Sequence, residues 1–97
     1  MTKTMIGSYV VVRTYSAGVH CGVLLAQEGR EVRLATARRI WSWRGANTLS
    51  EISQTGLSVG DSRVSIEVPE ILLTEAIEII PCSAVGGACL RGARWAE

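Results

Sequence analysis

Three strand-like stretches joined by two very short turns limit the folds that this chain can adopt. The stretches span residues 8–15, 19–27 and 31–43, and they are rich in the β-branched and aromatic residues that favour strands. The turns between them, Ser16-Ala17-Gly18 and Glu28-Gly29-Arg30, are far too short for a parallel crossover. The first half of the sequence therefore predicts an antiparallel meander.

Two places in this meander are expected to depart from regular pairing. Gly22 lies inside the second stretch, where a glycine marks a bulge or the close approach of another backbone. The third stretch loses its alternation at Ala35-Thr36-Ala37, where small residues permit a bulge. Both features predict a bent sheet.

The second half predicts two helices. Thr48 and Glu51 have the spacing of a capping box, so a helix should begin after Thr48 and end before Gly56. Ser83 is expected to cap a short C-terminal helix that ends near Leu90.

Alternation also predicts two further strands, at residues 63–68 and 74–80, each ended by a proline. The predicted fold class is α+β. We expect a single domain over residues 1–97, with a small, mostly antiparallel five-stranded sheet, one helix after the third strand and a short C-terminal helix.

Composition excludes several classes of protein. With 47% hydrophobic and 20% charged residues, the chain is too apolar to be disordered. It contains no apolar stretch of the length that a membrane span needs. We also expect no signal peptide, because Arg13 interrupts the short apolar run near the start of the sequence. We therefore expect no membrane partner and a cytoplasmic location.

The net charge of +1 combines two opposed halves. Residues 1–47 carry seven basic and two acidic side chains, and residues 48–97 carry three basic and seven acidic ones. This division is open to three interpretations: an anion-binding surface on the first half, self-association of the two halves between copies, or two halves that face each other within one fold.

No arrangement of residues indicates catalysis or metal binding. The three cysteines, Cys21, Cys82 and Cys89, make a poor disulfide framework and lack zinc spacing, so we expect reduced thiols, no metal and no cofactor. His20 is the single histidine, and it should point away from Cys21 because neighbouring strand residues face opposite sides. Phosphate-loop and nucleophile motifs are absent, so we do not expect an enzyme.

Residues 36–48 carry most of the binding chemistry, with three arginines, two tryptophans and an asparagine. Aromatic rings stack on bases, guanidinium groups bind phosphates, and a helix N-terminus favours an anion. Alternation predicts that Arg39, Trp41 and Trp43 share one face, with Trp43 at its rim. The alternative is a core face, since strand tryptophans are commonly buried beside arginine stems. The candidates are Arg38, Arg39, Trp41, Trp43, Arg44, Asn47 and Thr48.

The segment around the first turn is the second candidate region. A turn that contains serine and glycine lets backbone amides approach a ligand, and a tyrosine and a histidine lie beside it. The alternative is an ordinary hairpin turn next to a buried histidine. The candidates in this region are Arg13, Tyr15, Ser16, Gly18 and His20.

Three segments carry a resemblance to a known family: RTYSAGVHCG, ARRIWSWRGANTLSEI and VPEILLTEAIEIIPCS. Over about residues 9–83 the chain resembles a family of small phage and prophage proteins of unknown function. In size and mixed α/β layout it also resembles the Thoeris anti-defence sponges. That resemblance implies the sequestration of cyclic ADP-ribose-type signals or cyclic oligonucleotides.

We therefore expect a phage anti-defence protein that binds a nucleotide-derived immune signal without cleaving it. A homo-oligomer would build the pocket, because a chain this short leaves little interior volume. One alternative is a protein-interaction module that docks on a host protein. The other is a weak nucleic-acid-binding protein, which a net charge of only +1 disfavours, so nucleic acid is not an expected partner.

Overall fold

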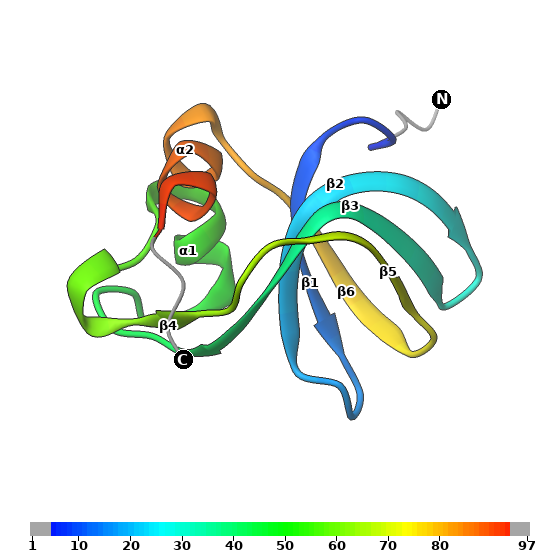
Figure 1. The fold of residues 1–97 in the computed structure, drawn as a ribbon, viewed down its shortest axis with the longest axis horizontal. Helices are drawn as coiled ribbons and strands as arrows, with labels where there is room; N and C mark the ends of the chain where they lie inside the picture. Colours follow the sequence, from blue (N-terminus) through cyan, green and yellow to red (C-terminus); the bar gives the residue numbers. More distant parts are fainter. Residues whose placement is uncertain (1–4, 94–97) are drawn as a thin grey trace.

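The antiparallel meander predicted for the first half is formed by β1 (Tyr9–Thr14), β2 (Val19–Glu28) and β3 (Glu31–Ser42). The computed structural model describes residues 5–93. The α+β class, with an antiparallel sheet and two helices, is confirmed (Figure 1). The remaining elements are α1 (Leu49–Thr55), a 3₁₀ turn (Val59–Asp61), β4 (Arg63–Val64), β5 (Val68–Leu73), β6 (Ala76–Pro81) and α2 (Ala84–Gly92).

The strands belong to one sheet in the order β4-β3-β2-β1-β6, and β5 pairs with β3 as well. This sheet has six strands, whereas the sequence predicts five. The prediction of one strand over residues 63–68 is wrong, because β4 ends at Val64 and a separate strand begins at Val68 and contains Pro69. A proline is tolerated in a strand that pairs on just one side. In the described part of the chain, β5 pairs with β3 alone.

A bulge interrupts β3 near its middle. Thr36 and Ala37 together lie opposite Gly22, since the pairs on either side are Cys21 with Arg38 and Val23 with Ala35. Thr36 has a φ of 47°, and a Cβ on Gly22 would lie 2.8 Å from the carbonyl oxygen of Ala35. The predicted bulge and the predicted close approach at Gly22 are both confirmed.

A second bulge lies nearer the hairpin turn, and here β2 carries the extra residue. Leu25 has no partner, because Leu24 pairs with Leu34 and Ala26 pairs with Arg33. The first bulge adds one residue to β3 and the second adds one to β2. Their register offsets therefore cancel, and Glu28 still pairs with Glu31 at the turn. Bulges increase the twist and bend of a strand, and the long β2–β3 pair curves strongly (Figure 1).

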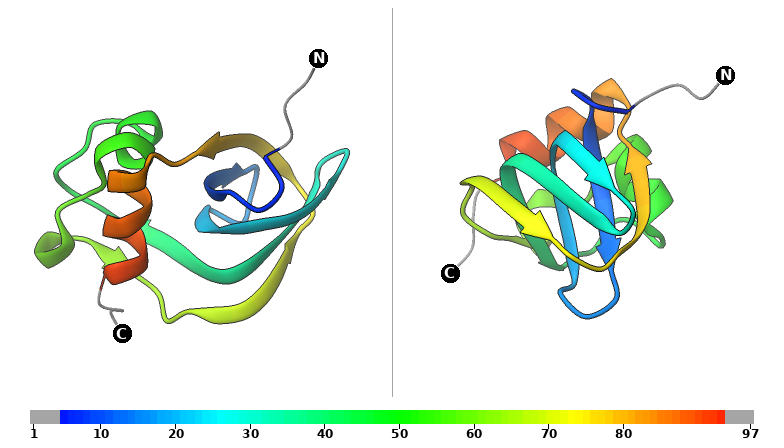
Figure 2. Two further views of the ribbon diagram at one scale, coloured as in Figure 1. Left: turned by 90° about the horizontal axis from the view of Figure 1, so that it is seen from above. Right: turned by 90° about the vertical axis from the view of Figure 1, so that its right-hand side faces the viewer.

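Two apolar clusters bury the two faces of this curved sheet. On β1 the side chains alternate, so that Val11 enters one cluster and Val12 the other. The helix-side cluster joins the sheet to both helices, which lie together on one side of the strands (Figure 2). Its buried members are Tyr9, Val11, Cys21, Ile40, Ile52, Leu57, Val64, Leu90 and Ala93. The inner cluster lies on the opposite face and contains Val10, Val12, Leu24, Val32, Leu34, Ala37 and Leu73.

The two helices pack against each other at a point where a side chain would not fit. A Cβ on Gly86 would collide with the carbonyl oxygen of Ser53 in α1, and that same oxygen accepts a hydrogen bond of 2.9 Å from the backbone N–H of Ser83. Glycine costs an isolated helix about 1 kcal/mol, and here the close α1–α2 contact requires it. In residues 5–93 neither helix is long and apolar enough to cross a membrane.

Candidate functional site

The candidate site is a cavity of about 440 Å³ between the helix-side end of the meander, the start of α1 and β6. We call it the Trp43 cavity. Its lining residues come from β1, β2, the loop after β3, α1 and β6. They are Arg13, Val19, Trp43, Asn47, Thr48, Leu49, Ser50 and Glu78. Four of the predicted binding residues, Arg13, Trp43, Asn47 and Thr48, therefore come together here.

The loop that carries Trp43 is fixed by backbone contacts. The N–H of Arg44 donates to the Ser62 hydroxyl at 3.0 Å, and the Arg44 carbonyl accepts from the Ser58 N–H at 2.8 Å. Gly45 has a φ of 84°, and a Cβ there would lie 2.9 Å from the Ser58 nitrogen. The loop therefore needs glycine at this position, and it does not depend on the exposed Arg44 side chain.

The start of α1 brings polar groups to the same cavity. The Thr48 hydroxyl accepts from the Glu51 N–H at 3.2 Å, and a Glu51 carboxylate oxygen accepts from the Asn47 N–H at 3.4 Å. The Thr48 hydroxyl keeps its proton as a donor, and within the described residues the Asn47 side-chain amide has no hydrogen-bond partner. Because α1 has only seven residues, we assign no anion to its N-terminus alone.

The charges that line the Trp43 cavity are balanced. Arg13 on β1 and Glu78 on β6 are register partners and both line the cavity. Among residues 5–93 the two side chains do not form an ion pair with each other or with another residue. The cavity thus offers a cation, an anion, an amide and hydroxyls around the half-buried Trp43 ring.

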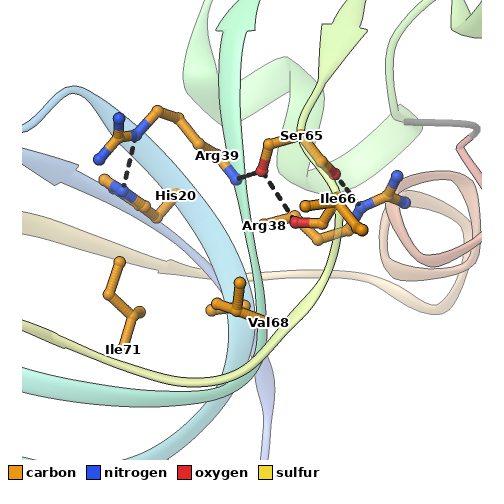
Figure 3. Close-up of a pocket in the computed structure, with 8 residues that line it drawn as sticks. His20, Arg38, Arg39, Ser65, Ile66, Val68 and Ile71 are labelled. Atoms are coloured by element: carbon orange, nitrogen blue, oxygen red, sulfur yellow. Dashed lines mark hydrogen bonds between the residues drawn. The ribbon is translucent and has the colours of Figure 1, made fainter. Parts of the chain in front are cut away.

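A different cavity contains two of the other predicted residues. His20 and Arg39, register partners on β2 and β3, line a space of about 190 Å³ (Figure 3). His20 is 1% exposed, and its Nε2 accepts a hydrogen bond of 3.2 Å from Nε of Arg39. Burial, and then the nearby guanidinium charge, lower the pKa of His20 to about 4. We call this space the His20 cavity.

Arg38 also lines the His20 cavity, but most of its guanidinium serves the fold. The side chain is 5% exposed, its Nε donates to the Ser65 carbonyl at 2.9 Å, and its Nη1 donates to the Leu90 carbonyl at 2.8 Å. A longer contact of 3.4 Å reaches the Arg91 carbonyl. The Leu90 and Arg91 carbonyls lie in the last turn of α2, where backbone acceptors lack partners within the helix. The predicted phosphate-binding role therefore does not fit the position of Arg38.

The prediction that Arg39, Trp41 and Trp43 share one face is wrong. Arg39 lies on the His20 face, whereas Trp43 packs against the helix-side cluster on the opposite face. The pairing between β3 and β4 shifts register after Ile40, and β3 ends at Ser42, so simple alternation fails beyond that point. Trp41 is 50% exposed, with the Arg63 guanidinium 5.4 Å from its ring centroid.

The turn between β1 and β2 joins neither cavity. Tyr15 is 78% exposed, and the Ser16 hydroxyl donates to a Glu75 carboxylate oxygen at 2.7 Å. The Thr14 hydroxyl donates to the Gly18 carbonyl at 2.7 Å and accepts from the Ala17 N–H at 2.9 Å. Here the geometry supports the alternative of an ordinary hairpin turn.

The surroundings of Cys21 and Cys82 disfavour the reactive thiolate form. His20 and Cys21 face opposite sides of the sheet, as expected from alternation. Burial raises the pKa of the Cys21 thiol to about 11, although the Tyr9 hydroxyl and Arg38 act in the opposite direction. Burial likewise raises the pKa of Cys82 to about 11. In the part of the chain that the structure describes, no cluster of three or more potential ligands is suited to a metal ion.

Comparison with known proteins identifies the family to which this fold belongs. A family model described as a domain of unknown function, DUF6948, matches residues 7–90. The chain belongs to the DUF6948 family. The match includes all six strands and most of α2. No curated protein and no solved structure matches this DUF6948 chain.

Sequence reasoning missed Glu78 as a member of the Trp43 cavity. Glu78 lies 65 positions after Arg13 in the chain, and only the β1–β6 pairing brings the two together. The opposed charge of the two halves was the available signal, since one of its interpretations is that the halves face each other. At this cavity the two halves do face each other, since Arg13 comes from the basic half of the chain and Glu78 from the acidic half.

Proposed function

We propose that this DUF6948 chain binds and sequesters a nucleotide-derived immune signal, of the cyclic ADP-ribose or cyclic oligonucleotide type, without cleaving it. The Trp43 cavity is the proposed site, and the cytoplasm of an infected bacterium is the proposed place of action. The observation that supports this is the convergence of Arg13, Trp43, Asn47 and Thr48 on one cavity.

Each lining group suits a part of one nucleoside unit. The Trp43 ring offers a surface on which a base can stack. The free amide of Asn47 suits a base edge, and the carboxylate of Glu78 accepts hydrogen bonds from ribose hydroxyls or a base amino group. Arg13 suits one phosphate.

The size and charge of the cavity limit how much of the ligand it holds. A volume of about 440 Å³ lies in the lower part of the range for small-molecule sites, and one arginine faces one glutamate. Such a site takes a single nucleoside unit and little phosphate charge. The remainder of a cyclic ligand needs another surface, for which we propose the exposed Arg44 loop and a second copy of the chain.

Calorimetry with cyclic ADP-ribose isomers and with cyclic di- and trinucleotides tests this function. The wild type should bind at least one of them, and Asn47→Ala should weaken binding about tenfold because it removes a hydrogen bond to the ligand. Trp43→Leu should weaken it similarly by removing the stacking surface. Trp41→Leu is the matched control, since Trp41 lies outside the cavity.

Two results would count against the proposal. If the wild type binds none of these nucleotides, the function is wrong, and docking on a host protein becomes the better candidate. Exposed apolar side chains at Val68 and Leu72 on β5 favour that alternative. If nucleotides bind but Asn47→Ala and Trp43→Leu bind like the wild type, the function stands and the Trp43 cavity is not its site.

A further inference from the structure

The residues that line the His20 cavity have no role in the nucleotide binding proposed above. It lies between the middle of the β2–β3 pair and residues 65–71, which form the approach to β5 and its first half (Figure 3). Most of its wall is apolar, and the side chains responsible are Ala37, Ile66, Val68 and Ile71. The polar groups gather on one side, around His20 and Arg39.

His20 is left with an unused donor. Its Nε2 accepts from Arg39, and with the pKa of His20 lowered to about 4 the ring is neutral near pH 7. A neutral imidazole whose Nε2 accepts must carry its proton on Nδ1. Among the described residues, Nδ1 of His20 is the one buried side-chain nitrogen or oxygen without a hydrogen-bond partner. Buried donors are normally satisfied, so this one calls for an acceptor that the chain itself does not supply.

The charge around the cavity is positive. Arg39 uses only its Nε on His20, and its two terminal nitrogens have no partner among residues 5–93. Arg38 also lines the cavity, but its guanidinium points away from it toward the end of α2 (Figure 3), and no carboxylate lines the cavity. The adjacent hydroxyl is already occupied, because Ser65 Oγ accepts from the Arg39 N–H at 2.7 Å and donates to the Ile66 carbonyl at 3.1 Å. An anion is therefore favoured, and the terminal nitrogens of Arg39 are the groups free to bind it.

We propose that the His20 cavity binds a small organic carboxylate, with its carboxylate on the Arg39 guanidinium and its apolar body against Ile66, Val68 and Ile71. A guanidinium matches the two oxygens of a carboxylate. A volume of about 190 Å³ is slightly larger than the roughly 150 Å³ of an apolar cavity that holds benzene. The ligand body is thus a single ring or a short alkyl chain. An acceptor on the ligand, or a water that it traps, satisfies the Nδ1 donor of His20.

This site is separate from the Trp43 cavity, so the proposal does not depend on nucleotide binding. His20 is the only histidine in the chain, so its Cε1 proton gives a single, unambiguous signal in NMR spectra. Titration with benzoate and with hexanoate should shift that signal saturably, with a Kd of about 1 mM, as expected for fragments of this size. Benzamide keeps the ring without the charge, and inorganic phosphate keeps the charge without an apolar body. Both should bind at least tenfold more weakly.

Two variants locate the binding. Arg39→Gln should weaken benzoate binding at least tenfold, and Arg30→Gln, at an exposed turn residue outside the cavity, should leave it unchanged. Val68→Phe should block binding by filling the space while it keeps both arginines. Backbone amide spectra establish that each variant is folded before it is titrated.

The proposal fails if neither carboxylate shifts the His20 signal at concentrations of about 10 mM, which corresponds to very weak binding. It fails equally if benzamide matches benzoate, because the carboxylate is then not recognised. Phosphate that binds as tightly as benzoate would mean an adventitious ion only. Unchanged binding by Arg39→Gln would remove Arg39 from the site.

Discussion

Replacing Arg38 tests whether this arginine holds the fold together or serves a ligand. Its side chain crosses from β3 to the last turn of α2, and it donates to the carbonyls of Ser65 and Leu90 at 2.9 and 2.8 Å. Arg38→Met keeps the apolar stem of the side chain as far as the position of Nε and removes both hydrogen bonds. The two acceptors then remain in a region where water has little access.

The size of the effect follows from these contacts. A hydrogen bond from a charged donor contributes about 1.5–3 kcal/mol, so two such bonds amount to about 3–6 kcal/mol. A buried methionine avoids the desolvation of a charge, which returns part of this loss. We expect Arg38→Met to lower the free energy of unfolding by about 2–4 kcal/mol. That is a large share of the roughly 5–15 kcal/mol that stabilises a typical domain.

Urea unfolding followed by circular dichroism measures this loss. Arg33→Met on the same strand is the matched control, because its ion pair with Glu70 is about half exposed on both sides and should contribute no more than about 1 kcal/mol. Arg38→Lys should fall between the two, since one ammonium does not reproduce the planar fork. If Arg38→Met unfolds within about 1 kcal/mol of the wild type, the structural role assigned to Arg38 is wrong.

Three further predictions concern titration, thiols and assembly. The pKa of His20 is lowered from 6.5 to about 4 in the folded protein, so the unfolded chain binds a proton at His20 more tightly. The free energy of unfolding should therefore fall as the pH drops from about 6.5 to about 4. An NMR titration of His20 with a midpoint above 6 would contradict this. Arg39→Gln should raise the pKa of His20, because it removes the guanidinium charge that lowers this pKa in addition to burial. Titration of the denatured, unreduced protein should find three free thiols, and in the folded protein Cys21 should react slowest; a single free thiol would mean a disulfide. Light scattering at micromolar concentration should show a homo-oligomer, and a monomer both with and without nucleotide would refute this.

Local patterns were sufficient to predict the meander and the bulge at residues 35–37, but not the second bulge at Leu25. Short turns force neighbouring strands to pair, and small residues at 35–37 predict a bulge without knowledge of the partner strand. Pro69 misled the strand assignment, because a strand that is paired on one edge can contain a proline, and edge position is not visible in sequence.

The candidate sites were harder to predict because they depend on distant pairings. The candidates chosen from sequence divide between two cavities, a turn and a structural contact, and Trp41 and Arg44 lie exposed outside all of these. Residue type does not say on which face a side chain lies after a bulge. Arg39 and Trp43 illustrate this, with a register shift between them that puts them on opposite faces. Glu78 joins Arg13 only through the pairing of β1 with β6, which sequence spacing does not reveal.

The two cancelling bulges determine how this hairpin can change in length during evolution. Relative to each other, Thr36 is the extra residue of β3 and Leu25 the extra residue of β2, so losing either one removes a bulge and preserves every other β2–β3 pair. Losing Thr36 also shifts β3 against β5, where Thr36 lies opposite Pro69, whereas Leu25 has no register partner in β1. A deletion elsewhere, such as Arg33, moves all residues on one side of it to the opposite face, unless the partner strand also shortens. Deleting Leu25 should therefore leave a sheet that is folded by circular dichroism, whereas deleting Arg33 should not; equal stability of the two would disprove this. Across relatives, we expect gaps in this hairpin at these two positions, or in matched pairs.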